Sequence, residues 1–169
     1  MASELYSRHV LTLQDRIFRF SRRLLSSEAA AQDATQEVLL KLWKLRDQLK
    51  NVNNIEAYVM ITTKNLCYDV LKSKHSKTLE LVHSNYSREG SCLSSEIDAK
   101  DEASLVSKFI NDLPEQQRAV IQLRDVEQFT NKEIEEIMNM NSTSVRVALS
   151  RARKKIISEL KKSSDYGIK

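Results

Sequence analysis

Side chains able to bind DNA are concentrated in residues 142–162. An arginine can form two hydrogen bonds to a guanine edge in the major groove, and serine or threonine hydroxyls bond to several base edges. Neighbouring lysines and arginines bind phosphates, which gives affinity without sequence preference. We expect Arg146 to contact bases. The full set of candidates comprises Thr143, Ser144, Arg146, Ser150, Arg151, Arg153, Lys154 and Lys155.

The residues before this segment carry the signals of a helix-turn-helix. Thr130 and Glu133 fit a capping box, in which each side chain bonds to the other residue's backbone amide, so a helix is expected from about residue 131. Asn139 suits the left-handed conformation that ends a helix. Asn141 or Ser142 can cap a second helix, which continues to about residue 160. A short helix, a tight turn and a longer basic helix predict a helix-turn-helix whose second helix enters the major groove.

Charge is distributed unevenly along the 169 residues, whose net charge is +4. Acidic residues dominate the segment 101–140, and basic residues dominate 142–162. Two basic segments in helical sequence favour two contacts with a polyanion. The alternative is a set of solvated lysines that only keep the protein soluble. The second basic segment contains Lys64, Lys72, Lys74 and Lys77.

The composition excludes several classes of protein. With 2 glycines and 1 proline, the chain lacks the turn residues of a β-sandwich or barrel and the glycine loops that bind phosphate. No histidine or cysteine has metal-ligand spacing, and Cys67 and Cys92 are expected to be unpaired thiols. We therefore expect no metal, no cofactor and no enzymatic activity. Because no secretory signal or membrane span is visible, we expect a cytoplasmic protein without membrane insertion.

Apolar residues that recur at steps of three and four predict an all-α fold of two small domains. Three amphipathic helices are expected in residues 1–77, and a polar stretch predicts a flexible linker over 78–100. The second domain, 101–169, is expected to hold a helix that begins near Pro114. Three side chains of that helix are predicted to face the core, namely Val120, Leu123 and Val126.

Several motifs resemble those of bacterial RNA polymerase sigma factors of the sigma-70 family. Residues 33–43 and 65–69 resemble region 2, and residues 113–118 and 150–155 resemble region 4. The two regions, in this order and joined by a short linker, resemble the extracytoplasmic-function (ECF) class. Asn139 replaces a glycine of the family pattern, and asparagine is the next best residue for a left-handed turn.

This resemblance implies roles in promoter recognition for both domains. Region 4 would bind the −35 element with the residues named above. Region 2 would hold unstacked bases of the −10 element, with Asn53, Asn54, Asn65, Asp69, Lys72 and Lys74 as candidates. Leu39, Leu42 and Trp43 are expected in the core.

The same resemblance implies protein partners. Asp33, Gln36 and Glu37 share one helix face and would meet the clamp helices of the polymerase β′ subunit. Further implied partners are the β flap, promoter DNA and an anti-sigma factor. Nucleotide addition would be catalysed by the polymerase.

Two other functions fit parts of the sequence. A stand-alone helix-turn-helix regulator would explain residues 113–160 but would leave the motifs in 33–43 and 65–69 without a role. A helical adaptor would carry the basic helix without touching DNA, so its binding would not depend steeply on salt.

Overall fold

The computed structural model describes residues 4, 6–82 and 102–166, and all elements assigned within these ranges are helical. The prediction of an all-α fold is therefore confirmed. Within the same ranges, no helix has both the length and the apolar character needed to cross a bilayer.

The N-terminal unit (residues 6–82) consists of η1 (Tyr6–Val10), η2 (Leu11–Leu13), α2 (Gln14–Leu25), α3 (Glu28–Lys44), η3 (Gln48–Asn51) and α4 (Ile55–Val82). The C-terminal unit (residues 102–166) consists of α5 (Glu102–Asn111), α6 (Glu115–Ile121), η4 (Gln122–Val126), α7 (Asn131–Met138) and α8 (Ser142–Tyr166).

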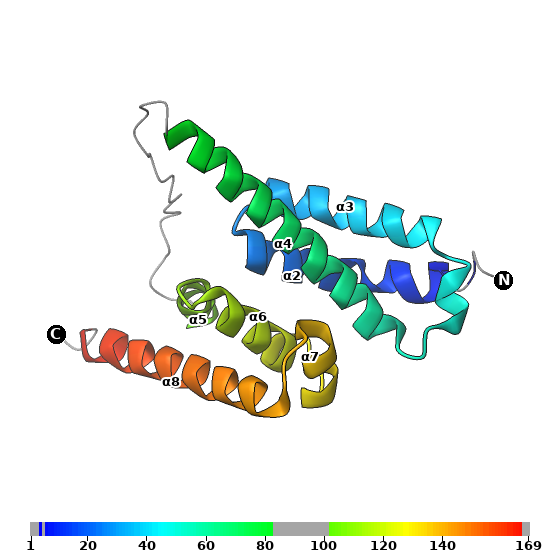
Figure 1. Ribbon diagram of the computed structural model, residues 1–169. Helices are drawn as coiled ribbons and strands as arrows, with labels where there is room; N and C mark the ends of the chain where they lie inside the picture. The colour runs from blue at the N-terminus through cyan, green and yellow to red at the C-terminus, as the bar shows by residue number, and fades with distance from the viewer. Residues whose placement is uncertain (1–3, 5, 83–101, 167–169) are drawn as a thin grey trace.

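The three predicted helices of the N-terminal unit are α2, α3 and α4, which pack side by side (Figure 1). Ser26 adopts a left-handed conformation (φ 53°) that ends α2. The Ser27 hydroxyl then accepts a hydrogen bond from the Ala30 amide and caps α3. The turn between these helices is short for this reason. Helix α4 continues to Val82, beyond residue 78, where we expected the linker to begin.

A π-helical turn changes the direction of side chains in the C-terminal unit. In η4 the Glu127 amide donates to the Gln122 carbonyl at 3.0 Å, an i+5 bond. This wider turn adds a residue relative to an α-helix and rotates the residues that follow. Val126 is consequently 43% exposed, so the prediction that it faces the core was wrong, whereas Glu127 is only 3% exposed. The predictions for Val120 and Leu123 are confirmed, since both are fully buried.

Among the residues that the structure describes, apolar packing forms three clusters, one of which joins the two units. One cluster belongs to the N-terminal unit and includes Val38 and Leu42, and another belongs to the C-terminal unit and includes Ile121 and Ile156. The third, the shared cluster, contains residues of both units. In Figure 1, α6 and α7 lie against α2 and α4. The members of the shared cluster used below are Phe20, Leu24 and Met60 of the N-terminal unit and Val120, Leu123, Phe129, Ile134 and Ile137 of the C-terminal unit.

Two titratable side chains lie in or against the shared cluster. Burial raises the pKa of the Cys67 thiol to about 11. Burial, together with the Glu115 carboxylate, raises the pKa of Tyr68 to about 12. Cys67 is therefore a protonated, unpaired buried thiol at neutral pH, as expected. The second cysteine, Cys92, lies outside the described residues.

Candidate nucleic-acid interface

The predicted helix-turn-helix is formed by α7 and α8. The Thr130 hydroxyl accepts a hydrogen bond from the Glu133 amide at 3.3 Å, and the Glu133 carboxylate accepts one from the Thr130 amide at 2.8 Å. Both bonds of the capping box are thus present. Asn139 is left-handed (φ 52°, ψ 51°) and ends α7, and the Asn141 side chain accepts from the Ser144 amide at 2.8 Å. The local predictions for both helix ends are confirmed.

The capping box also changes the acidity of Glu133. The Thr130 amide donates to the carboxylate and lowers the pKa of Glu133, with smaller contributions from the Thr130 hydroxyl and from Asn54. A hydrogen bond to the charged form favours that form. Glu133 is therefore ionised at neutral pH and fixes the first turn of α7.

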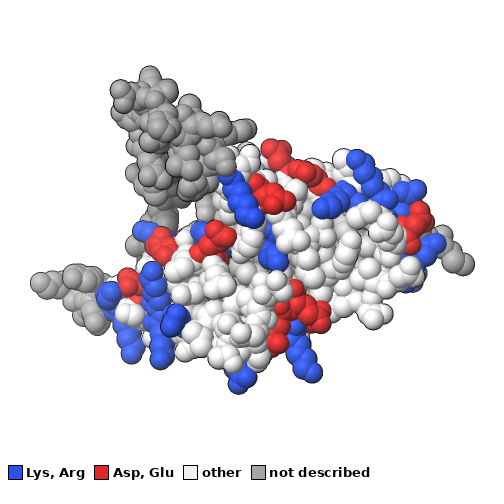
Figure 2. All heavy atoms as spheres, viewed as in Figure 1, with Lys and Arg blue, Asp and Glu red and all other residues white. Residues whose placement is uncertain are grey.

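Helix α8 has one buried face and one exposed basic face. Its buried residues pack on the rest of the C-terminal unit and include Val145, Leu149 and Ala152. In Figure 2, lysine and arginine side chains gather along the edge of the molecule that α8 occupies. Ser144 is half-buried, and the other predicted DNA contacts are exposed, namely Thr143, Arg146, Ser150, Arg151, Arg153, Lys154 and Lys155.

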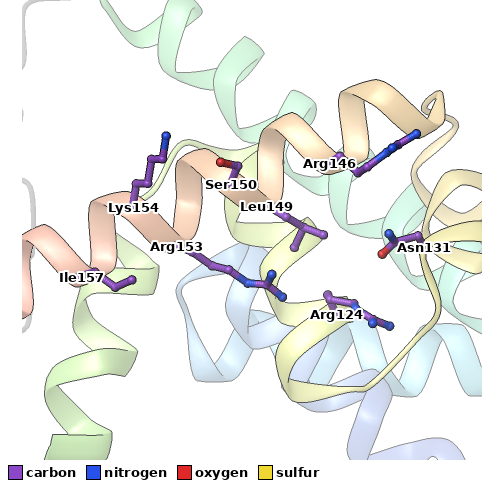
Figure 3. A pocket seen from close by; sticks show the side chains of 8 residues that line it. All are labelled: Arg124, Asn131, Arg146, Leu149, Ser150, Arg153, Lys154 and Ile157. Atoms are coloured by element: carbon purple, nitrogen blue, oxygen red, sulfur yellow. The ribbon is translucent and has the colours of Figure 1, made fainter.

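A hollow of about 400 Å³ lies on the basic face of α8. Figure 3 shows that Arg124 and Asn131 approach it from η4 and α7, opposite α8. The Asn131 side-chain oxygen is buried there and has no hydrogen-bond partner within the part of the chain that the structure describes. Sequence reasoning missed both residues as site residues. The residues that line the hollow are Arg124, Asn131, Arg146, Leu149, Ser150, Arg153, Lys154 and Ile157.

Several basic side chains of this face already have partners within the chain. Arg153 forms two hydrogen bonds with Asp125, one of them 3.1 Å long, and this contact raises the pKa of the guanidinium. Arg146 donates to the Ser142 hydroxyl at 3.0 Å, one turn earlier in α8. Arg153 must exchange its carboxylate partner to bind a phosphate, whereas Arg146 must exchange only a neutral hydroxyl.

The residues predicted to bind the −10 element lie on α4 and on the loop before it. Asn65, Asp69 and Lys72 are exposed and follow one another at i, i+4 and i+7, so they share a helix face. Lys74 and Asn53 are also exposed. The structure therefore brings most of these candidates to the surface of one unit.

Asn54 and Lys64 are not freely available at this surface, because one is hydrogen-bonded within the chain and the other is buried. Asn54 accepts from the Ala57 amide at 3.0 Å, which caps α4, and donates to Glu133 of α7 at 2.9 Å. Lys64 was expected to follow phosphates, but it is only 8% exposed, and burial lowers its pKa. That interpretation of Lys64 was wrong for this conformation, since its stem lies in packed structure. The side chain of Lys77 lies outside the described residues.

The acidic face of α3 carries the predicted polymerase contacts, and Asp33, Gln36 and Glu37 are all exposed. Leu39 and Leu42 are buried as expected, but Trp43 is 39% exposed. Its indole packs edge-on against Tyr6 (5.1 Å between ring centroids) and lies 4.6 Å from the Arg46 guanidinium. The prediction of a core Trp43 was wrong because α3 is covered on one side only.

Each of the two units matches a protein-family model. The family model "Sigma-70 region 2" matches residues 9–77, and "Sigma-70, region 4" matches residues 104–156. Two RNA polymerase sigma-E factors, from Streptomyces avermitilis and Streptomyces coelicolor, are each 25% identical to this chain over 158 residues. The alignments cover 92% of this chain and 84% and 85% of those proteins.

Two solved structures share the fold. The sigma factor RpoE from Bartonella quintana, crystallised with the anti-sigma factor NepR, has a TM-score of 0.75 and 20% identity over 92% of this chain and 96% of that one. CnrH, in complex with the cytosolic domain of CnrY, has a TM-score of 0.67 and 16% identity over 94% and 89%.

Two helical units, the second with a capped helix-turn-helix and a basic outer face, define a DNA-binding protein of the transcription machinery. The matched regions make the assignment specific. The chain belongs to the sigma-70 family, with region 2 in its N-terminal unit and region 4 in its C-terminal unit, and it acts as a sigma factor in transcription initiation.

Proposed function

We propose that this protein is an ECF-type sigma factor that binds core RNA polymerase, opens promoter DNA and reads two promoter elements with its two units. The observation that carries the proposal is the presence of region 2 and region 4 in this order along the chain. The exposed basic face of α8 supplies the chemistry for duplex DNA. The helical units 6–82 and 102–166 would be the working parts, and the segment between them would be the tether.

The C-terminal unit would bind the −35 element as duplex. Arg146 and Ser144 lie in the first turns of α8, where a recognition helix meets base edges. Arg151, Lys154 and Lys155 would bind phosphates and set the salt dependence. Arg124 and Asn131 line the same hollow from outside α8, so we add them to the proposed interface.

The N-terminal unit would hold the −10 element after strand separation. Asn65 offers both a donor and an acceptor to a base edge, and Asp69 lies one turn further along the same face. Lys72 and Lys74 would bind the backbone of the displaced strand. Asn53 lies on the loop before α4, where an unstacked base could be received.

Protein partners would bind other surfaces. The exposed acidic face of α3, made by Asp33, Gln36 and Glu37, would meet the β′ clamp helices, and region 4 would meet the β flap. One structural neighbour is a sigma factor bound to an anti-sigma factor, which supports an anti-sigma partner here, and the other, CnrH, is bound to the cytosolic domain of CnrY. The protein would act in the cytoplasm and leave nucleotide addition to the polymerase.

In vitro transcription tests the proposal directly. Core bacterial polymerase is combined with the purified chain and genomic promoter fragments, and the start sites are mapped. We expect specific starts that depend on the chain and are lost on charge reversal of Asp33 and Glu37. Tight duplex binding without polymerase, together with no effect on transcription by the core enzyme, would instead indicate a stand-alone helix-turn-helix regulator.

A further inference from the structure

An exposed ion pair joins η4 to α8 beside the proposed DNA-binding face. The Arg153 guanidinium donates one hydrogen bond to each carboxylate oxygen of Asp125, and one of these bonds is 3.1 Å long. The side chains of Arg153 and Asp125 are 49% and 39% exposed. An ion pair in contact with water contributes little to folding, because the solvent screens the attraction. The pair therefore acts mainly on charged molecules that approach this surface.

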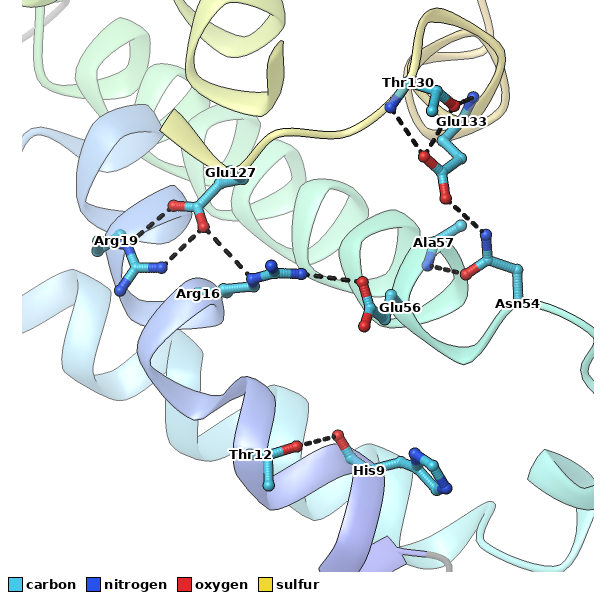
Figure 4. A network of polar contacts seen from close by, with 10 residues as sticks. All are labelled: His9, Thr12, Arg16, Arg19, Asn54, Glu56, Ala57, Glu127, Thr130 and Glu133. Atoms are coloured by element: carbon cyan, nitrogen blue, oxygen red, sulfur yellow. Dashed lines mark hydrogen bonds and ion pairs between the residues drawn. The ribbon is translucent and has the colours of Figure 1, made fainter. Parts of the chain in front are cut away.

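A second acid, two positions further along the chain, has a different role. The Glu127 side chain is only 1% exposed, and Arg19 of α2 donates to both of its oxygens, at 2.9 and 2.8 Å (Figure 4). A buried carboxylate is costly unless it is paired and hydrogen-bonded, so the fold itself requires the partner of Glu127. Asp125 is under less constraint, because water reaches its carboxylate. Its pairing with Arg153 is therefore available for a role in binding.

Arg153 is one of four cationic side chains that line the hollow on the basic face of α8. In Figure 3 its side chain points away from Lys154 and toward Arg124 of η4. The guanidinium thus lies between α8 and η4, where the Asp125 carboxylate meets it. The four cations are Arg124, Arg146, Arg153 and Lys154.

These cations differ in the charge of their partners. Within the part of the chain that the structure describes, only Arg153 of the four is paired with a carboxylate. Arg124 donates to the Phe129 backbone carbonyl at 2.8 Å, and Arg146 donates to the Ser142 hydroxyl at 3.0 Å. A neutral partner leaves the charge of a guanidinium in place, whereas a carboxylate cancels it at a distance. With four cations and one carboxylate, the hollow presents three uncompensated positive charges.

The Asp125 carboxylate occupies the donors with which Arg153 would bind DNA. The planar fork of a guanidinium matches a phosphate as well as a carboxylate. The same two donors would therefore bind a backbone phosphate if Asp125 were neutral. Phosphate contacts carry no sequence information, and they supply essentially all of non-specific binding. A released Arg153 would thus strengthen binding to DNA of any sequence.

The gain would be smaller on the correct site than on unrelated DNA. On the correct site, base contacts by Arg146 would fix the register of α8, so Arg153 could not follow the backbone to the nearest phosphate. On unrelated DNA no base contact fixes the helix, and α8 can shift until Arg153 meets a phosphate. Weakening the attraction to a wrong partner is one of the two routes to specificity.

We propose that Asp125 is a specificity-determining residue that withholds Arg153 from phosphates and so raises the preference of α8 for its −35 element over unrelated DNA. Asp125 acts through Arg153, as a positioning residue. The inference rests on the proposed recognition of the −35 element by the C-terminal unit. Its effect on unrelated DNA needs only that the chain binds duplex.

Fluorescence anisotropy of the full chain on two duplexes of equal length tests the proposal. One duplex carries the −35 element of a mapped promoter, and the other has an unrelated sequence. Asp125→Asn keeps the size of the side chain and removes its charge. Affinity for the unrelated duplex should rise roughly tenfold, and affinity for the −35 duplex by no more than about twofold. The slope of log affinity against log salt should steepen by about one on the unrelated duplex.

Three further variants provide the controls. Asp125→Glu retains the charge and should keep the wild-type preference. Glu159→Gln removes the same charge from another ion pair of α8, in which Lys162 lies 2.8 Å from Glu159 and neither residue lines the hollow. It should leave the ratio of the two affinities unchanged. Asp125→Ser is measured in parallel, so that the result does not depend on how one substituted side chain packs. Circular dichroism and urea midpoints establish that all variants are folded.

Each alternative outcome has a distinct meaning. If Asp125→Asn raises both affinities by the same factor, Asp125 lowers affinity without setting specificity, and the proposal is wrong. Unchanged affinities, or an equal loss of preference in Glu159→Gln, overturn it as well. If the wild-type chain itself shows no preference for the −35 duplex and supports no transcription with core polymerase, the proposed function fails. A failure of this inference alone leaves the wild-type preference intact.

Discussion

The two proposed nucleic-acid surfaces differ in how exposed their residues are and in how many of these residues form contacts within the chain. Of the predicted DNA contacts on α8, Ser144 is half-buried and the others are exposed, and Arg153 is paired with the Asp125 carboxylate. On the N-terminal unit, Asn54 is bonded to the other unit, and Lys64 is buried. The proposed −35 surface is thus exposed in this conformation, whereas part of the proposed −10 surface is engaged within the chain.

The exposed surface should show the largest effect of a single substitution. Arg146→Ala removes a side chain that would make a bidentate base contact, so affinity for a −35 duplex from a mapped promoter should fall by roughly 10- to 100-fold. Preference at the contacted base should relax as well. Fluorescence anisotropy of the full chain on wild-type and base-substituted duplexes measures both. Unchanged affinity and preference would show that the proposed register of α8 on DNA is wrong.

On the proposed −10 surface, substitutions of Asn65 and Asn54 should have different effects. Asn65→Ala should weaken binding to a single-stranded −10 oligonucleotide by up to about tenfold, the value of one good hydrogen bond. Asn54→Ala should instead lower the free energy of unfolding by about 1 kcal/mol, because Asn54 caps α4. Oligonucleotide titrations and urea denaturation of both variants separate binding from stability. A stronger loss of binding for Asn54 than for Asn65 would reverse this assignment.

The capping box of α7 lies beside Asn54 of the N-terminal unit, because Asn54 donates to Glu133. Its contribution to the free energy of unfolding depends on pH. Thr130→Ala should lower the free energy of unfolding by about 1 kcal/mol at pH 7. Because the pKa of Glu133 is lowered in the folded chain, its stabilisation is present above the ordinary value of 4.5 and is lost as pH falls through the lowered value. Urea denaturation at pH 7 and below pH 4 should therefore show a smaller difference from wild type in acid. An equal difference at both values would exclude the ionised carboxylate as the cause.

The smallest expected effect distinguishes free from paired cations on α8. Lys154→Gln should weaken binding to all duplexes by a similar factor and reduce the slope of log affinity against log salt by about one. Arg153→Gln should change the slope less, because Arg153 is paired with Asp125. Salt titrations of both variants on two unrelated duplexes provide the comparison. Equal slope changes would mean that the Asp125 pair opens readily on DNA.

Local signals in the sequence predicted the helix-turn-helix of the C-terminal unit well. The capping box at Thr130, the left-handed Asn139 and the cap at Asn141 depend on backbone groups within a few residues, so they follow from local chemistry. The exposed face of α8 follows from its apolar period of three and four residues. The sequence motifs also indicated the family before the fold was known.

The tertiary structure decided which side chains are exposed and which are buried or paired across the two units. The π-helical turn at η4 moved Val126 outward and Glu127 inward, because one additional residue in a turn rotates everything after it. Arg19 and Glu127 are separated by 108 positions in the chain, and no local pattern encodes a contact at that separation. The sequence by itself determined the helices, their caps and their charged faces, since these depend on near neighbours. The packing of the two units, the burial of Lys64 and the contact between Arg19 and Glu127 depend on how two finished surfaces fit together, and only the folded chain contains that information.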